Sequence, residues 1–258
     1  MLAKATQTEN HYDSYLEQHI QQFDPISLAE IQEAALLDRI DTKYLMGIDQ
    51  LATILPQVTE DYRALTINNI RLHAYETLYF DTDNFSFYEQ HHNGVSPRFK
   101  VRARKYVDTD LTFFEVKHRT NQRRTIKSRL PINDVVMDLS EQLTDFTSEH
   151  VHCETDQLES KLWNDYQRMT LVSKDQPERV TIDLNLKYRW QDAQVALPGI
   201  VIVEVKQAKR FQPSSFITQM RDLGIRSTSY SKYVAGVYSL YQGVKTNNFK
   251  SQIRMVNK

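Results

Sequence analysis

The sequence predicts an α+β protein in which an antiparallel β-sheet closes into a barrel with helices on its outer side. Several strand-like segments alternate charged and apolar residues, and side chains on a strand alternate between its two faces. Residues 200–205 are too apolar for one face to be solvated, yet Glu204 and Lys206 interrupt the segment on one side. A barrel with a charged interior accounts for both observations. The alternative is a sheet with a solvated face, whose cross-strand ion pairs contribute at most about 1 kcal/mol each.

The composition is that of an ordinary globular protein. Of 258 residues, 40% are apolar and 25% are charged, and the formal net charge is -1. Only six glycines occur, and neither glycine-rich phosphate-binding motif is present. The single cysteine excludes a disulfide within this sequence and is typical of a reducing compartment. Because we find no leader and no apolar run of about 18 residues, we expect a cytoplasmic protein that reaches a membrane only through a partner.

Helices are predicted from capping and breaking signals. Ser27 and Glu30 have the spacing of a capping box, and a helix that begins at Ile48 is expected to end at Pro56. Asp83 is the expected N-cap of a short helix at 84–90, and Ser214 is the expected N-cap of a helix at 215–223. Further helices are expected at 132–143, at 158–164 and after residue 229, and a polar loop at 144–156.

Strands are predicted from alternation, which is clearest at 180–188. The other predicted strands are 38–46, 62–65, 75–80, 99–106, 112–119, 166–172 and 200–206. We find no repeat and no linker, so we expect one domain at 25–245, between a polar arm at 1–24 and a polar, basic tail at 246–258.

The segment Ser96–Leu130 is strongly basic. It contains eleven Lys or Arg residues and three acids, although the whole chain is nearly neutral. We therefore expect it to bind a strongly anionic partner. One predicted strand places Lys100, Arg102 and Arg104 on the same face. The next places Glu115, Lys117 and Arg119 together, and it is followed by Arg123, Arg124, Lys127 and Arg129.

A surface lined by many cations and few carboxylates suits chains of phosphate with a divalent metal. Arginine binds phosphate oxygens in a bidentate manner, lysine supplies point charges, and carboxylates bind Mg²⁺ or Mn²⁺. Phosphoryl transfer depends mainly on positioning and charge neutralisation. An ionised phosphate acceptor carries no proton to remove, whereas hydrolysis requires a carboxylate that orients water. The excess of cations therefore favours transfer over hydrolysis.

The residues together resemble the polyphosphate polymerase domain of the vacuolar transporter chaperone (VTC) family over about residues 36–240. That family belongs to the triphosphate tunnel metalloenzymes, whose fold is an eight-stranded antiparallel tunnel. The resemblance implies a polymerase that moves the γ-phosphate of ATP onto polyphosphate with Mn²⁺ or Mg²⁺. The segments that carry it are Asp41-Thr42-Lys43-Tyr44, Arg102-Ala103-Arg104, Glu115-Val116-Lys117, Tyr166-Gln167-Arg168, Val180-Thr181-Ile182-Asp183, Glu204-Val205-Lys206 and Ser231-Lys232-Tyr233.

The resemblance also implies roles for individual residues. The expected catalytic residues are Lys43, Arg102, Arg104, Lys117, Arg168 and Lys232. Further substrate-binding residues are expected to be Arg39, Lys100, Lys127, Arg129, Tyr166, Lys206 and Ser231, and we prefer Arg129 to Lys127 as the basic residue that follows the Glu115 strand. Glu204 and Glu115 are the expected metal ligands. Asp183 is either a further ligand or the ion-pair partner of Arg168, and we favour the pair.

One departure from the hydrolytic tunnel enzymes bears on the reaction. Those enzymes carry Glu-x-Glu-x-Lys on the first strand, where this sequence has Arg39-Ile40-Asp41-Thr42-Lys43. The loss of one metal carboxylate favours the polymerase over a triphosphatase of the same fold.

A non-catalytic binder of polyphosphate or nucleic acid is the third hypothesis. Glu204 in an apolar strand has no use in such a protein, so we do not expect nucleic acid as a partner. We expect ATP and polyphosphate as ligands, with a membrane protein as a further possible partner. The cluster from His150 to Glu154 matches no common zinc spacing, and we interpret it as a polar loop.

Overall fold

The computed structural model describes residues 15–33, 39–122, 124–151, 158–208, 213–250 and 253. These residues form two compact units, which we describe in turn. Unit 1 comprises the described residues within Met1–His73, Gln167–Leu186 and Leu197–Tyr230, and unit 2 those within Ala74–Tyr166, Lys187–Ala196 and Ser231–Lys258. The long strands β8 (Leu158–Ser173) and β9 (Glu178–Trp190) contribute residues to both units.

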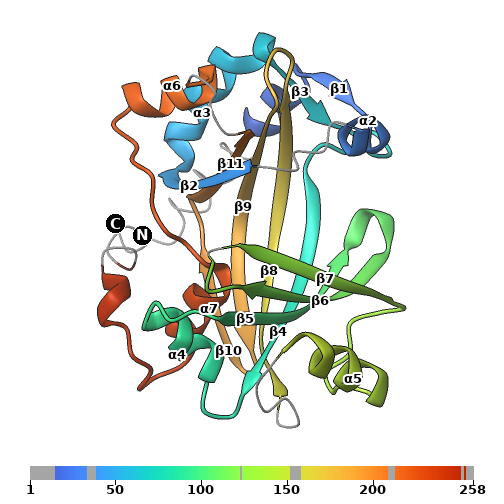
Figure 1. The fold of residues 1–258 in the computed structure, drawn as a ribbon. Helices are drawn as coiled ribbons and strands as arrows, with labels where there is room; N and C mark the ends of the chain where they lie inside the picture. The colour runs from blue at the N-terminus through green and yellow to red at the C-terminus, as the bar shows by residue number, and fades with distance from the viewer. Residues whose placement is uncertain are drawn as a thin grey trace. The chain divides into compact units, whose positions relative to one another are not determined.

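Unit 1 is a mostly antiparallel sheet with helices on one face (Figure 1). Its remaining elements are β1 (Asp24–Ile26), α2 (Leu28–Glu33), β2 (Arg39–Gly47), α3 (Ile48–Val58), β3 (Tyr62–Leu65), β11 (Ile200–Ala208) and α6 (Ser215–Asp222). The strand order is β2-β11-β9-β8, with β3 beside β8 and β1 beside β3. Strand β11 is antiparallel to both of its neighbours, and only the short β1 is parallel to its partner β3.

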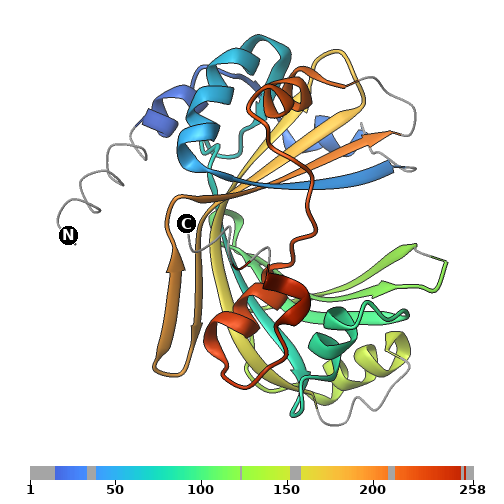
Figure 2. The same cartoon turned by 90° about the vertical axis from the view of Figure 1, so that its left-hand side faces the viewer.

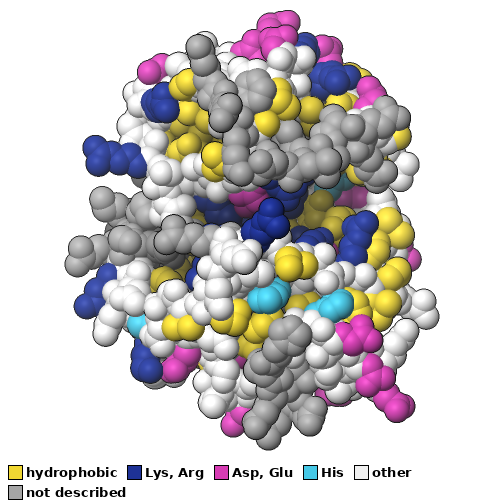
Figure 3. Space-filling model, viewed as in Figure 1, with side chains coloured by type: hydrophobic (Ala, Val, Ile, Leu, Met, Phe, Trp, Pro, Cys, Tyr) yellow, Lys and Arg dark blue, Asp and Glu magenta, His cyan; other side chains and the backbone are white. Residues whose placement is uncertain are grey.

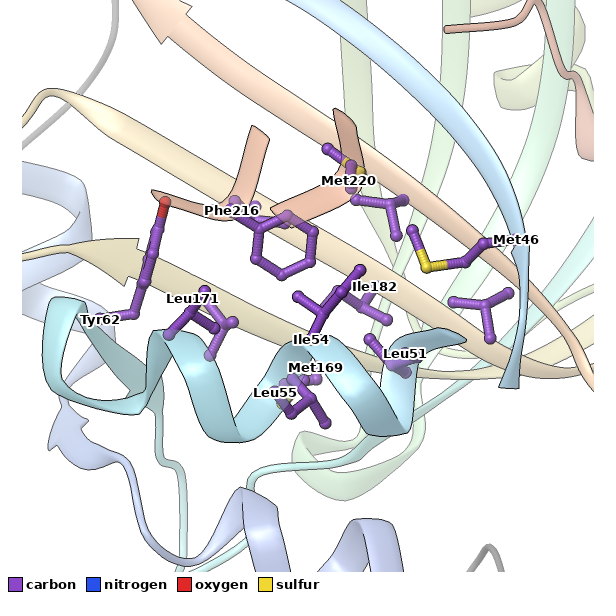
Figure 4. Close-up of a cluster of buried hydrophobic side chains, with 14 of the residues drawn as sticks. Met46, Leu51, Ile54, Leu55, Tyr62, Met169, Leu171, Ile182, Phe216 and Met220 are labelled. Atoms are coloured by element: carbon purple, nitrogen blue, oxygen red, sulfur yellow. The ribbon is translucent and has the colours of Figure 1, made fainter. Parts of the chain in front are cut away.

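The core of unit 1 lies between this sheet and the helices α3 and α6, which cover the same face of the strands (Figure 2). Leu51 and Ile54 of α3 face Phe216 and Met220 of α6, with Ile182 of β9 beside them (Figure 4). All five side chains are buried. Because side chains alternate along each strand, this apolar face leaves the intervening residues, including the charged ones, on the opposite face.

Unit 2 is an antiparallel sheet with the strand order β9-β8-β4-β5-β6-β7, and β10 pairs with β9. Its elements are β4 (His73–Thr82), α4 (Ser86–His92), β5 (Arg98–Tyr106), β6 (Leu111–Arg119), β7 (Thr125–Ile132), α5 (Glu141–His150), β10 (Ala193–Leu197) and α7 (Lys232–Leu240). The apolar face of β4, β5 and β6 includes Phe80, Val101 and Phe114, which pack with Phe87 of α4 and Leu143 of α5. The basic side chains Lys100, Arg102, Arg104 and Lys117 lie on the other face.

Helix α7 is held closely against unit 2. Gly236 lies so near to β8 and β9 that an added Cβ atom would be 2.8 Å from Leu162 Cδ1 and 2.8 Å from Tyr188 Cδ1. The hydroxyl of Tyr233 donates a hydrogen bond to the buried carboxylate of Asp81 on β4. The same carboxylate also accepts hydrogen bonds from backbone N–H groups in the first turn of α4. One buried carboxylate therefore ties β4, α4 and α7 together.

The predicted fold class is confirmed, and the two strand orders together contain eight principal strands. Four local predictions are wrong. The segment predicted as a helix at 158–164 belongs to β8, and the helix predicted at 132–143 is instead α5, which occupies much of the predicted loop at 144–156. Helix α3 continues past Pro56 to Val58, and the N-cap of α4 is Phe85, not Asp83. No helix in the described part of the chain is long and apolar enough to cross a membrane.

The close approach of α7 makes Gly236→Ala a test of this packing. Overpacking costs about 1 to 3 kcal/mol, which exceeds the gain of at most about 1 kcal/mol that alanine has over glycine in a helix. We expect the free energy of unfolding in urea to fall by about 1 kcal/mol. Ser239→Ala on the same helix should change it by less than about 0.5 kcal/mol. Equal stability of the two variants would contradict the packing described here.

Candidate functional site

Charged side chains of unit 1 lie on the sheet face opposite α3 and α6. Glu204 on β11 is directly opposite Lys43 on β2 and Thr181 on β9, and Lys206 is opposite Asp41 and Arg179. This pairing brings together residues that are far apart in the sequence. We define the first charged face as Arg39, Asp41, Lys43, Arg168, Arg179, Asp183, Glu204 and Lys206.

Two carboxylates of the first charged face are paired with arginine. Arg168 binds Asp183 in a bidentate manner, with Nε 2.6 Å from Oδ1 and Nη2 2.9 Å from Oδ2, which confirms the predicted pair. Arg39 Nε lies 3.0 Å from Asp41 Oδ1. The bidentate pair is strong because donor geometry and charge agree, and it engages both oxygens of Asp183, which is therefore poorly suited to bind a metal. The Arg39–Asp41 contact joins one nitrogen to one oxygen of a partly exposed carboxylate and is the weaker pair.

Glu204 is held by lysines instead. Its Oε2 is 3.0 Å from Lys206 Nζ, its Oε1 is 4.0 Å from Lys43 Nζ, and its side chain is 20% exposed. Lys43 Nζ also donates a hydrogen bond of 3.0 Å to the carbonyl of Tyr230. Burial lowers the pKa of Lys206, and Glu204 offsets this only in part. The face therefore holds more positive charge than its carboxylates neutralise.

Arg179 is a residue of this face that the sequence analysis missed. Burial lowers its pKa, and the positive charges of Arg39 and Arg168 lower it further. The sequence does indicate its position, because Arg179 directly precedes the clearest alternating segment and has the same strand parity as Thr181 and Asp183. An anion placed among these guanidinium groups would relieve their mutual repulsion.

A second, more basic face lies on unit 2. Lys100, Lys117 and Lys127 are directly opposite one another across β5, β6 and β7, and so are Arg102, Glu115 and Arg129. The pairing thus gathers basic residues from three strands on one side of the sheet. We define the second charged face as Lys100, Arg102, Arg104, Glu115, Lys117, Lys127, Arg129 and Lys232, with Tyr79 and Tyr166. Figure 3 shows, for one view of the protein, where Lys and Arg side chains are exposed.

Glu115 is enclosed by basic side chains. Arg102 Nη2 and Nε lie 2.7 and 2.8 Å from its Oε2, and Lys127 Nζ contacts its Oε1. Burial opposes ionisation of this carboxyl, which is 1% exposed, but the charges of Arg102, Arg104 and Lys127 outweigh burial and hold its pKa well below the usual range. Both oxygens are thus engaged, and this argues against the predicted metal role of Glu115. It serves as a counter-charge that fixes Arg102 and Lys127.

Tyr79 and Tyr166 lie among the remaining cations. Arg102 Nη1 is 3.4 Å from the Tyr79 hydroxyl. Although Tyr79 is buried, which opposes its ionisation, the charges of Arg102, Arg104 and Lys232 lower its pKa. The ring of Tyr166 has Lys232 Nζ at 4.5 Å and the Arg104 guanidinium carbon at 5.8 Å from its centroid. The electric potential around these two tyrosines is therefore strongly positive.

Helix α7 brings its first residues to this face. Ser231 is its N-cap, and the Ser231 hydroxyl oxygen accepts hydrogen bonds from Val234 N at 3.4 Å and from Lys100 Nζ at 2.8 Å. A helix N-terminus carries partial positive charge. Ser231 and Lys232 can thus both contribute to binding an anion beside Lys100.

A divalent metal fits only one of the two predicted ligands. The described residues contain no group of three or more His, Cys, Asp or Glu side chains that could hold an ion. Mg²⁺ bound with phosphates commonly uses only one or two protein carboxylates, with phosphate oxygens and water completing its shell. Glu204 fits this mode because it is partly exposed between lysines that would attract phosphate.

Fourteen of the fifteen predicted site residues lie on the first or the second charged face. The other, Ser231, is the N-cap of α7 beside the second charged face. The predicted basic residue Arg123 lies outside the described residues, as do His152, Cys153 and Glu154. His150 ends α5 and packs against the ring of Phe146. The preference for Arg129 over Lys127 stays a prediction, since both lie on the second charged face.

Comparison with known proteins gives one family and a shared fold. The VTC domain family matches residues 38–241. No curated protein matches the chain. A solved Hippeastrum protein, described as an adenylyl cyclase with a dominant triphosphatase activity, is 10% identical with a TM-score of 0.51 over 80% of this chain and 98% of its own. A Bacillus halodurans protein described as an adenylate cyclase is 13% identical with a TM-score of 0.45 over 75% and 94%. The Hippeastrum likeness shows a shared fold.

Removing the charge of Glu115 should destabilise the protein. In Glu115→Gln, Arg102 and Lys127 lose their counter-charge, so we expect the free energy of unfolding in urea to fall by about 2 to 4 kcal/mol at pH 7. The matched change Asp110→Asn, at an exposed partner of Lys105, should cost less than about 1 kcal/mol. Equal losses in the two variants would show that the buried ion pairs are unimportant.

The pH dependence of the stability difference between wild type and Glu115→Gln follows from the lowered pKa of Glu115. A carboxyl whose pKa is lower in the folded state stabilises the protein fully above its unfolded pKa of about 4.5, and the contribution is lost as the pH falls towards the folded pKa. We therefore expect the stability difference between wild type and Glu115→Gln to stay constant from pH 7 to about pH 5. It should shrink only below that.

Proposed function

Because the chain belongs to the VTC domain family, we propose that it is a metal-dependent polyphosphate polymerase that transfers the γ-phosphate of ATP onto an inorganic polyphosphate chain. The observation that carries this proposal is the second charged face, where many basic residues surround Glu115, whose charge Arg102 and Lys127 already balance. The face as defined contains seven basic side chains and one carboxylate, so a phosphate ligand would add negative charge where positive charge is in excess. Ligands with a high density of negative charge, such as ATP and polyphosphate, match this surface.

The chain's own residues would act by positioning and neutralisation. Arg102 and Arg104 are fixed by Glu115 and by Thr77 respectively, so their guanidinium groups need little reordering to bind phosphate oxygens. Lys232 would add a further positive charge beside Tyr166. The terminal phosphate of a polyphosphate chain is ionised and needs no base to attack. The pairing of Glu115 and Asp183 with basic residues is consistent with transfer rather than activation of water.

Glu204 is the proposed metal ligand. Mn²⁺ or Mg²⁺, when bound, would neutralise phosphate charge and help to orient the phosphate groups. Lys43 and Lys206 would hold the same phosphates from either side of Glu204, since both already lie beside its carboxylate. Arg39 and Arg168 would extend this positive surface along the first charged face.

A triphosphatase of the same fold is the second candidate. The partial exposure of Glu204 favours it, because a carboxylate that water can reach could also orient a water molecule for attack. The triphosphatase activity described for the Hippeastrum protein belongs to that protein and is in keeping with this possibility. A binder of polyphosphate or nucleic acid without catalysis would have no need of Glu204.

The remaining parts of the proposal concern context. We propose a catalytic domain at 25–245, with an arm at 1–24 and a polar tail at 246–258. Leu16, Ile20 and Phe23 of the arm are buried in the core of unit 1, so this part of the arm packs with the domain. A cytoplasmic location with a membrane protein as partner would allow the product chain to be passed on. These assignments rest on the sequence and on the proposed activity.

Product analysis tests the proposed activity. Purified protein incubated with ATP and Mn²⁺ should release ADP and give a ladder of long chains on a gel that resolves polyphosphate. Arg102→Ala should reduce the rate about 100-fold or more, because the loss of one preorganised donor to a developing charge has an effect of that size. Arg189→Ala, which removes an arginine paired with Asp165 away from both faces, should stay within about twofold.

The alternatives give different products. Free phosphate without chains would establish the triphosphatase and overturn the polymerase. If the protein binds polyphosphate tightly but shows no turnover with any divalent metal, only the hypothesis of a non-catalytic binder remains.

Glu204→Gln tests the metal role. We expect loss of activity with polyphosphate binding kept or slightly tighter, because the variant removes a negative charge from a cationic surface. Chelation of divalent metal should abolish wild-type activity, and added Mn²⁺ should restore it in the wild type but not in Glu204→Gln. Glu89→Gln, at an exposed pair with Lys245, is the control and should behave like wild type. A metal-independent activity would exclude this role for Glu204.

A further inference from the structure

A row of aromatic rings crosses the sheet of unit 2 on the same side as the second charged face. The ring centroids of Tyr166 and Tyr75 are 5.1 Å apart, those of Tyr75 and Tyr106 are 5.0 Å apart, and those of Tyr106 and Phe113 are 6.0 Å apart. The four residues come from the neighbouring strands β8, β4, β5 and β6. We call them the aromatic row.

The aromatic row lies directly beside the basic residues. The guanidinium carbon of Arg104 is 5.7 Å from the Tyr75 ring centroid, and that of Arg129 is 4.8 Å from the Phe113 centroid. Along β5, side chains on this face follow one another as Lys100, Arg102, Arg104 and Tyr106, at steps of about 6.6 Å. The face is therefore cationic towards one end of the strands and aromatic towards the other.

The aromatic row differs from the aromatic core of the same sheet. Phe80 and Phe114, on the opposite face, are fully buried beneath α5. Tyr106 and Phe113 are only partly buried, and Leu111, directly opposite Tyr106, is 51% exposed. Cross-strand aromatic pairs can stabilise a sheet by themselves. An exposed apolar surface next to concentrated positive charge also matches a ligand with a flat apolar part and an anionic tail.

We propose that the aromatic row binds the nucleobase of a nucleoside triphosphate whose phosphates extend over Arg104 and Arg102. Bases stack on aromatic side chains and on guanidinium groups, and such stacking tolerates different bases. Tyr106 and Phe113 would be the principal stacking residues, with Arg129 beside them. This proposal rests on the proposed function and makes the site selective for nucleotides over inorganic triphosphate. It also sets a direction, with the terminal phosphate nearest Arg102 and Lys100.

The test compares two ligands that share the triphosphate and differ in the base. We would measure binding of ATP and of inorganic tripolyphosphate by titration calorimetry for wild type, Tyr106→Leu and Phe113→Leu, which keep an apolar side chain but lose the ring. Loss of one stacking partner should weaken ATP binding about tenfold. Tripolyphosphate binding should stay within about twofold, since no basic residue is changed.

Trp163→Leu is the matched control. Its ring is also partly buried in unit 2 and has an arginine, Arg189, over it at 4.5 Å, but it packs with the apolar core of the sheet. This variant should bind both ligands like wild type. Thermal unfolding of each variant would establish that it is folded.

Three results would overturn the proposal: ATP affinity unchanged in both ring variants, equal weakening of both ligands, or no ATP binding by wild type. Because calorimetry needs no turnover, failure of the polymerase activity would be seen separately. If wild type forms no chains but its ATP affinity still depends on Tyr106 and Phe113, the aromatic site stands and the polymerase does not.

Discussion

The alternation of side chains along antiparallel strands is the constraint on which the rest of the structure depends. In each unit it turns apolar residues such as Val203 or Phe114 towards covering helices, and the residues between them, such as Glu204 and Glu115, towards the other face. A shift of one residue in register would exchange the two sets. The same interactions that form the core therefore also determine which charges are brought together.

The charged faces are costly to assemble, and the structure compensates for this in two ways. Carboxylates are embedded among the cations, as Glu115 is between Arg102 and Lys127 and as Asp183 is against Arg168. Where these pairs do not suffice, like charges remain close, as at Arg179. The polyanionic ligand that we propose would supply negative charge at these positions, so its binding would also relieve the repulsion.

The sequence predicted eight of the strands and the parity of their charges because both depend on a two-residue period, but it did not identify β7 or β10 as strands. It predicted the Arg168–Asp183 pair for the same reason. The prediction is wrong for 158–164, because Leu158, Leu162 and Trp163 have the spacing of a helix although the segment pairs within the sheet. It is also wrong for α5, where Leu143, Phe146 and His150 have helical spacing in a mostly polar sequence that obscures it. The metal role predicted for Glu115 does not allow for Lys127, because the sequence cannot show that this lysine reaches the carboxylate from β7. An ion-pair partner on a neighbouring strand is determined by the register of the two strands, which the sequence alone does not give.

The buried carboxylate of Asp81 has a consequence for the affinity of the second charged face. It anchors Tyr233, which directly follows Ser231 and Lys232, and burial raises its pKa, as expected for a carboxyl enclosed in the core. The start of α7 is therefore fixed in place before any ligand arrives. Preorganised groups lose little conformational entropy on binding, so more of their electrostatic attraction is expressed as affinity. Under the proposed function, a hydrogen bond in the core would therefore help to determine how tightly Lys232 binds phosphate.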